Sequence, residues 1–255
     1  WMMRALAAGK HVLCEKPLAR ARAEARAAYA AARAAGLHLA EAYPYMSQPQ
    51  TLRLRELLAE GAIGRVQLAT AAFGFGIASP EGEPLVDPKN IRLDPAVGGG
   101  ALLDAGTYAM SFLRLAIGEA PTRARAAGRF TKAGVDQTVA ATLEFPSGAI
   151  AQLTTSLATA FHRHAIVIGE RGVIETGYGN HAPAGATTLP LRIKRGVPGT
   201  VPFATEELPA GDGFRAEAES FARLLRQGRT HWNGASEAES IDTVRALEAI
   251  AASLR

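Results

Sequence analysis

Two segments of the sequence combine residue types that can move a proton. In the first, "HVLCEKPLA", an apolar run ends in Glu15-Lys16-Pro17. In the second, "GGGALLDAGTYAMS", Asp104 and Tyr108 stand four residues apart, so both project from one side of the predicted helix. A phenol and an ammonium can serve as acid and base once neighbouring groups shift their pKa values toward neutral pH. On spacing alone, these residues also have a structural explanation without catalysis: Asp104 would be an acid favoured in the first turn of a helix, and Lys16 an exposed lysine at a strand end.

Helices and strands alternate around the first segment. The sequence predicts a helix over 2–8, a strand over 11–14, a helix over 21–35 and a strand over 37–43. Short connections in a βαβ order predict parallel strands. The carboxyl end of such a strand faces the cofactor crevice in α/β folds, which would put Lys16 there.

From residue 65 onward, the pattern changes to strands joined by short turns. Strands are predicted over 65–75, 124–131, 137–145, 148–157 and, as a hairpin, 165–176. Helices are predicted over 48–61, after the triple glycine 98–100, over 214–228 and over 236–255, with loops over 79–98 and 177–213. Adjacent strands with short turns predict an open, mostly antiparallel or mixed sheet flanked by helices. The predicted fold class is therefore α/β followed by α+β.

Two other patterns do not predict a site. "GFGIAS" begins at Gly74 and is one residue short of the dinucleotide fingerprint, but Pro80 follows, so no helix can start there to bind a pyrophosphate. We interpret these glycines as strand residues. His162 and His164 share one face of a predicted strand with no acid or cysteine nearby in sequence, so they are predicted to be surface residues and no metal site is expected.

Composition narrows the class of protein further. The 255 residues are 48% hydrophobic and 20% charged, with a formal net charge of +4 carried by dispersed arginines, so no nucleic-acid partner is expected. No apolar run reaches the roughly 18–20 residues that a membrane span needs, and no signal-peptide pattern opens the sequence. One cysteine excludes an internal disulfide. A cytoplasmic protein without a membrane partner is expected.

The two segments together resemble the Gfo/Idh/MocA oxidoreductases. "AAGKHVLCEKPLA" is followed by "IRLDPAVGGG" and "GGGALLDAGTYAMSFLRLAIGEAP", and the resemblance covers nearly the whole chain. Tyr108 favours the branch of glucose-fructose oxidoreductase and dihydrodiol or xylose dehydrogenase. The resemblance implies hydride transfer between NAD or NADP and a sugar, polyol or related alcohol. It implies a dinucleotide-binding Rossmann-like part over 1–43 and an α+β substrate and oligomerisation domain over 44–255. It also implies a homo-oligomer formed through the open sheet face.

The resemblance also implies a role for individual residues. Tyr108 would be the acid/base, Lys16 its electrostatic partner and Asp104 a group that orients the substrate or the lysine. The residues implied to lie at the cofactor are Glu15, Lys16, Pro17, Arg92 and Tyr45.

The family resemblance carries one further expectation. In the family, a glycine fingerprint and its strand precede the Glu-Lys-Pro strand, so about 70–80 residues of the nucleotide-binding half are expected to be absent before Trp1. The alternative prediction is therefore a non-catalytic binding or scaffold protein that has lost nucleotide binding.

Overall fold

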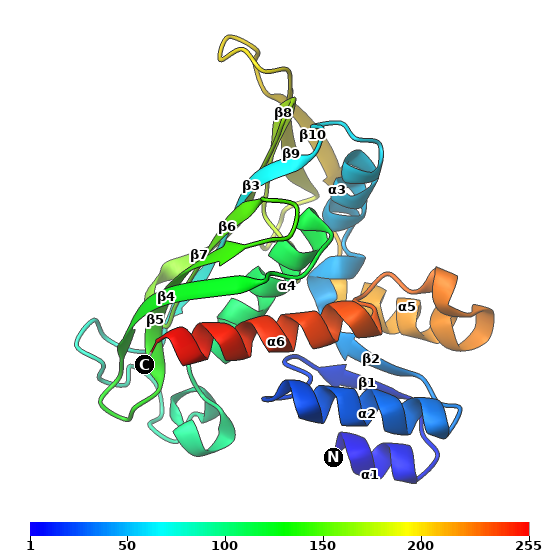
Figure 1. Cartoon of the computed structure of the whole chain (residues 1–255), viewed down its shortest axis with the longest axis vertical. Coiled ribbons are helices and arrows are strands. Elements are labelled where there is room, and N and C mark those ends of the chain that lie inside the picture. The colour runs from blue at the N-terminus through cyan, green and yellow to red at the C-terminus, as the bar shows by residue number, and fades with distance from the viewer. Residues whose placement is uncertain (255) are drawn as a thin grey trace.

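The computed structural model describes residues 1–254, which form a small sheet and a large sheet (Figure 1). The small sheet pairs β1 (Val12–Glu15) with β2 (Leu39–Ala42) in parallel, as predicted. Helix α2 (Arg22–Ala34) connects the two strands, and α1 (Met2–Ala7) lies beside it.

Helix α2 presents small residues to the small sheet. Arg26 and Arg33 are exposed, whereas the buried residues recur every one to four positions: Ala25, Ala28, Tyr29 and Ala32. They pack with Leu6, Leu39 and Val244, the last of which belongs to the C-terminal helix. The small sheet is therefore anchored to the C-terminal end of the chain.

The large sheet has eight strands in the order β10-β9-β8-β7-β3-β6-β5-β4. All neighbours are antiparallel except β3 and β6, which run parallel. The strands are β3 (Val66–Gly76), β4 (Arg123–Phe130), β5 (Asp136–Glu144), β6 (Ile150–Ser156), β7 (Ala158–Gly169), β8 (Gly172–Thr176), β9 (Thr188–Arg195) and β10 (Ala204–Pro209). The predicted fold class is confirmed.

Strands β9 and β10 lie in the segment 177–213, where the sequence predicted only a loop. That prediction was wrong because both strands give weak signals. In β9, only Leu191 and Ile193 are fully buried, and the proline at position 190 speaks against a strand. Strand β10 lies at the sheet edge and pairs only with β9, so it needs no buried face. The segment 79–98 also contains two short 3₁₀ helices, Ile91–Leu93 and Pro95–Val97.

Helices cover one face of the large sheet. Helices α3 (Pro49–Ala59), α4 (Thr107–Ile117) and α6 (Glu237–Ser253) pack against its strands, and α6 also contacts α2 (Figure 1). Helix α5 (Gly213–Gln227) packs against the 3₁₀ helix Pro44–Ser47. The core between helices and sheet includes Leu54, Leu57, Phe112, Leu113, Leu143 and Leu153.

The opposite face of the large sheet carries no helix among residues 1–254 (Figure 1). Leu68 of β3 and Ile150 of β6 are register partners there, and they are 46% and 44% exposed. The same part of the chain has no helix long and apolar enough to cross a membrane.

One π-helical turn, Leu102–Gly106, precedes α4, where the sequence predicted a continuous α-helix. Wider turns of this kind often occur at functional sites, and this one contains Asp104. The wider turn changes the angular position of Asp104 relative to Tyr108, so their four-residue spacing does not by itself bring them together.

The triple glycine lets the chain pass close to its neighbours before this turn. Gly100 has a φ of +120° and lies against the carboxylate of Asp136, where a Cβ atom would collide. A Cβ atom at Gly99 would approach the carbonyl oxygen of Arg92 to 2.7 Å. Asp136 Oδ2 accepts a hydrogen bond from the backbone N–H of Leu102 at 2.6 Å. Asp136 thereby fixes where the turn begins.

Asp136 gives the stability of the fold a testable pH dependence. Burial raises the pKa of Asp136 to about 6, whereas an unfolded aspartate titrates near about 4. The folded state then binds the proton more tightly, so its extra stability is present below about pH 4 and is lost as the pH rises through about 6. We expect the free energy of unfolding, measured by urea denaturation, to fall more steeply over this interval in the wild type than in Asp136→Asn. Asp212→Asn, which alters an exposed helix cap, is the control and should keep the slope; an unchanged slope in Asp136→Asn would contradict this.

Candidate active site

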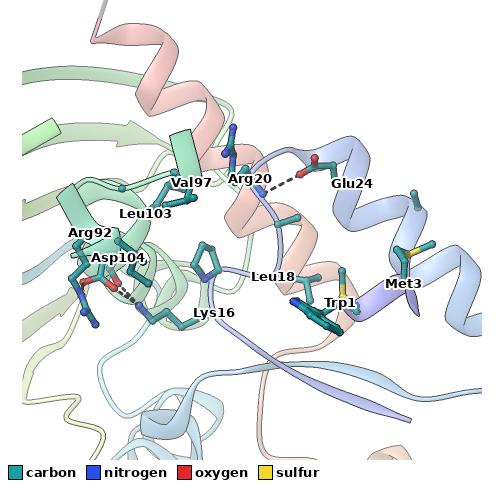
Figure 2. Close-up of a pocket in the computed structure, with 17 residues that line it drawn as sticks. Trp1, Met3, Lys16, Leu18, Arg20, Glu24, Arg92, Val97, Leu103 and Asp104 are labelled. Atoms are coloured by element: carbon teal, nitrogen blue, oxygen red, sulfur yellow. Dashed lines mark hydrogen bonds and ion pairs between the residues drawn. The ribbon is translucent and has the colours of Figure 1, made fainter. Parts of the chain in front are cut away.

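Lys16 and Asp104 form an ion pair between the small sheet and the π-helical turn (Figure 2). Lys16 Nζ lies 2.9 Å from Asp104 Oδ1 and 2.7 Å from the carbonyl oxygen of the same residue. Arg92 Nε lies 2.7 Å from Asp104 Oδ2. Three residues singled out from the sequence, from three separate segments, therefore meet at one carboxylate.

A buried acid holds the turn that carries Lys16. Glu41 of β2 is fully buried, and its Oε1 accepts a hydrogen bond from the backbone N–H of Leu18 at 2.8 Å. Burial raises the pKa of the Glu41 carboxyl. Sequence reasoning missed Glu41, although a single acid inside the otherwise apolar strand "LAEA" is a signal of a special role.

Tyr108 lies behind the ion pair in an aromatic cluster and is 5% exposed. Lys16 Nζ is 4.7 Å from the centroid of its ring, so the ammonium faces the ring and not the hydroxyl. The Tyr108 hydroxyl accepts a hydrogen bond from Asn180 Nδ2 at 3.0 Å. Asn180, in a segment with no recognisable pattern, was also missed by sequence reasoning.

The protonated form of the Tyr108 phenol is favoured. Its pKa is raised to about 12, chiefly by burial; the hydrogen bond from Asn180 and the charge of Arg163 oppose the rise, and the carboxylates of Glu15 and Asp104 add to it. The sequence suggested that Lys16 would lower this pKa toward neutral pH. The pKa of Tyr108 is raised instead, because the effect of burial is the largest and because the charge of Lys16 is paired with Asp104.

A second cation, Arg163 of β7, was not recognised in the sequence. Its guanidinium carbon is 4.2 Å from the centroid of the Tyr108 ring. It also faces the rings of Phe73, Tyr178 and Tyr45, at 4.6, 4.7 and 5.6 Å. The alternation of side chains along a strand could have identified it, because it places Arg163 on the same face as the buried residues Ala165 and Val167.

The two patterns set aside in the sequence occupy the positions expected of them. Gly74 and Gly76 are residues of β3, and no helix follows them. His164 is exposed and His162 is partly exposed, with ring centroids 6.0 Å apart. Within residues 1–254, no cluster of histidine, cysteine, aspartate and glutamate could hold a metal ion.

A cavity of about 700 Å³ opens beside Lys16 (Figure 2). Cationic side chains, two glycines and apolar side chains line it, among them Lys16, Pro17, Arg20, Arg92, Gly98, Gly99, Trp1 and Val97. Cations suit the phosphates of a dinucleotide, and glycines allow close approach of a ring system. Two of the three N–H groups of Lys16 go to Asp104, so one remains for a ligand. These residues fit the nicotinamide end of NAD or NADP.

Two residues implied to lie at the cofactor do not line this cavity, and their role there stays a prediction. Tyr45 is fully buried, and its hydroxyl is 2.9 Å from Ser111 Oγ, so it belongs to the core beneath Tyr108 and does not line the cavity. Glu15 is exposed at the end of β1 and lines a neighbouring shallow cavity with Trp1 and Val12. The sequence could not show that Lys16 and Pro17 line the cavity while Glu15 and Tyr45 do not, because it does not reveal which side each residue near a strand end faces.

Comparisons with known proteins agree with this architecture. The model described as "Oxidoreductase family, NAD-binding Rossmann fold" matches residues 1–43, and the model described as "GFO/IDH/MocA C-terminal domain" matches residues 51–175. D-xylose 1-dehydrogenase (NADP(+)) 2 of Haloferax volcanii is 34% identical over 98% of this chain and 72% of its own length. Trans-1,2-dihydrobenzene-1,2-diol dehydrogenase of Mus musculus is 37% identical over 67% of this chain and 49% of its own length.

Solved structures give the same result. An aldose-aldose oxidoreductase from Caulobacter crescentus, complexed with glycerol, superposes with a TM-score of 0.81 at 28% identity, over 99% of this chain and 72% of that one. A 3-ketoreductase from Actinomadura kijaniata, in complex with NADP and TDP-benzene, gives a TM-score of 0.81 at 30% identity, over 100% of this chain and 74% of that one.

A lysine at the end of a parallel strand, beside a cation-lined cavity and a large open sheet, defines a nicotinamide-dependent oxidoreductase. The chain belongs to the Gfo/Idh/MocA family of these enzymes, as its sequence resemblance predicted. The family confirms the predicted enzyme class and the predicted cofactors, NAD or NADP.

The ion pair at the centre of the site can be tested through stability. Asp104→Asn removes the carboxylate that Lys16 and Arg92 share, and leaves two cations facing a neutral amide. We expect the free energy of unfolding to fall by about 1–3 kcal/mol in urea denaturation, and the loss to shrink as salt screens the two cations. Asp242→Asn, which removes a carboxylate from Arg114 on α4 away from the cavity, is the control for a lost ion pair elsewhere. A stability equal to wild type in Asp104→Asn would contradict a central role for the pair.

Proposed function

We propose that this chain catalyses NAD(P)-dependent hydride transfer at a hydroxyl-bearing carbon of a sugar or polyol. The observation that carries the proposal is the Lys16–Asp104 pair, set over the Tyr108 ring and at the wall of the cavity. Lys16, Pro17 and Arg92 would hold the nicotinamide end of the cofactor. The cofactor, when bound, accepts hydride from the substrate carbon or returns it.

The chain itself handles the proton. Oxidation of an alcohol releases a proton from oxygen as hydride leaves carbon, and reduction of a carbonyl needs that proton back. Tyr108 Oη is the proposed donor and acceptor. Because the Tyr108 pKa is raised to about 12, the phenol holds its proton at neutral pH and is ready to give it to a carbonyl oxygen. The remaining N–H of Lys16 would bind the same substrate oxygen.

The substrate class is proposed from the relatives. A xylose dehydrogenase, an aldose-aldose oxidoreductase and a 3-ketoreductase bound to TDP-benzene are all similar to this chain. Hydroxyl-rich rings suit a cavity wall that includes Lys16, Arg92 and Asp104, since these offer both donors and acceptors.

We further propose the division into residues 1–43, which hold the cofactor, and residues 44–255, which hold the substrate and form a homo-oligomer. The exposed register partners Leu68 and Ile150 on the uncovered face of the large sheet support association through that face.

Tyr108→Phe tests the proposed proton donor. We expect kcat for reduction of a keto sugar by NADPH to fall by about 100-fold or more, because the proton donor is lost, while the KM for NADPH stays unchanged. Tyr43→Phe is the control, since Tyr43 lies in the same aromatic cluster but places its hydroxyl 2.6 Å from Thr107 Oγ1. Turnover by Tyr108→Phe at the wild-type rate would rule out the assignment.

The raised pKa of Tyr108 predicts opposite pH profiles for the two directions. Oxidation needs the phenolate, so its kcat/KM should rise with pH across the neutral range by about tenfold per pH unit. Reduction needs the phenol, so its chemical step should be independent of pH over the same range. The measurement is kcat/KM in both directions between about pH 6 and about pH 9. An oxidation rate that levels off near neutral pH would show that Tyr108 ionises far below the expected value.

A further inference from the structure

The guanidinium of Arg163 is buried without a carboxylate. Its Nε and Nη2 atoms are buried and have no hydrogen-bond partner among the described residues. Nη1 donates to Asn180 Oδ1 at 3.2 Å. Four aromatic rings surround the group, and no ion pair to Arg163 occurs within residues 1–254. A buried charge without a counter-charge costs stability, so its presence beside Tyr108 needs an explanation.

The contact with Arg163 determines how Asn180 faces Tyr108. A guanidinium has only donors, so the amide must turn its oxygen toward Arg163 and its Nδ2 group toward Tyr108. Nδ2 donates to Tyr108 Oη at 3.0 Å. The phenol oxygen is then an acceptor on that side, and its own proton must point elsewhere.

Charged and titratable groups face Tyr108 from every element around it. These are Lys16 and Glu15 at the end of β1, Asp104 in the π-helical turn, Arg163 on β7, and the phenols of Tyr43 and Tyr45. The phenol of Tyr178 faces Arg163. Lys16 is paired with Asp104, and the phenols are neutral at neutral pH because burial raises their pKa values. Arg163 is therefore the cation at this ring whose charge no carboxylate pairs within the described residues.

We propose that Arg163 and Asn180 are positioning residues for Tyr108. Through Asn180, Arg163 keeps the phenol oxygen an acceptor, so that the phenol proton is directed to the substrate oxygen, and its charge stabilises the phenolate that remains after the proton leaves. The proposal deepens the proposed function and rests on Tyr108 as the proton donor. It assigns the charge that favours ionisation of Tyr108 to Arg163 and not to Lys16.

A purely structural role for Arg163 makes a different prediction. As a cation packed between aromatic rings it would contribute to stability, but its loss would not change the ionisation of Tyr108 in a defined direction. A binding site for an anionic substrate is also less well supported, since the Nε and Nη2 atoms of Arg163 are buried.

The test is the pKa of Tyr108 itself, read without substrate or cofactor. The chain has five tyrosines. Incorporation of 3-fluorotyrosine gives each a ¹⁹F signal and lowers the phenol pKa values, which brings the titration toward pH values at which the fold survives. Tyr108→Phe identifies the signal of residue 108. Because no turnover is needed, this titration tests the proposal even if the chain proves inactive as a dehydrogenase.

We expect Arg163→Met to raise the pKa of fluorinated Tyr108 by about 1–3 pH units. Arg163→Lys keeps the charge and should restore most of the difference. Asn180→Asp should raise the pKa as well, because a carboxylate beside the phenol opposes the phenolate. Arg192→Met is the matched control, since Arg192 lies over the ring of Phe203 at 4.6 Å on the same sheet; its loss should leave Tyr108 unchanged.

An unchanged or lowered Tyr108 pKa in folded Arg163→Met would overturn the proposal. If Arg163→Met does not fold, Asn180→Asp decides: an unchanged or lower pKa in that variant is equally contradictory. Arg163→Lys should also fold and keep the pKa of fluorinated Tyr108 close to the wild-type value. A pKa raised as far as in Asn180→Asp would count against the role of charge.

Discussion

The ion pair between Lys16 and Asp104 is the interaction on which the site depends, because it joins two parts of the chain that are 88 residues apart in sequence. Both side chains are partly buried, so the pair is favourable only if its remaining polar atoms are satisfied. Arg92 satisfies the second carboxylate oxygen of Asp104. Glu41 holds the turn behind Lys16, and Asp136 fixes the turn that carries Asp104. Much of the surrounding structure therefore serves to bring one ammonium and one carboxylate together.

Burial of Tyr108 is the second constraint, and it raises the pKa of a phenol that is already protonated at neutral pH. Two cations lie against its ring, Lys16 at 4.7 Å and Arg163 at 4.2 Å. They are not equivalent, since a carboxylate pairs the first, whereas only an amide oxygen is hydrogen-bonded to the second. Desolvation raises the pKa of the phenol, and the charge of Arg163 and the hydrogen bond from Asn180 limit how far it rises. Under the proposed function, this separation would give Tyr108 both a proton to donate and a stabilised phenolate once that proton has left.

The sequence predicted the parts of this site that lie in local patterns. The end of β1, the glycine-rich approach to Asp104 and the helix with Tyr108 each have a short-range signature, and the structure has them where expected. Arg163 and Asn180 reach Tyr108 only through the pairing of β7 with β3 and through an irregular segment, which no short-range pattern encodes. Tyr45 shows the same limit: the sequence grouped it with the residues of the crevice, whereas its side chain is buried beneath Tyr108. Proximity along the chain to a strand end says little about which side of the core a side chain occupies.

The most direct test of this account is the binding of NADPH and NADH to the 255-residue chain. Trp1 lines the proposed cofactor cavity and Trp232 does not, so tryptophan fluorescence reports on that cavity, with calorimetry as a second readout. The account predicts saturable micromolar binding of at least one cofactor, quenched emission from Trp1, and weaker binding by Lys16→Met. A folded chain that binds neither cofactor up to millimolar concentration would contradict the assignment of the cavity beside Lys16 as a nicotinamide site.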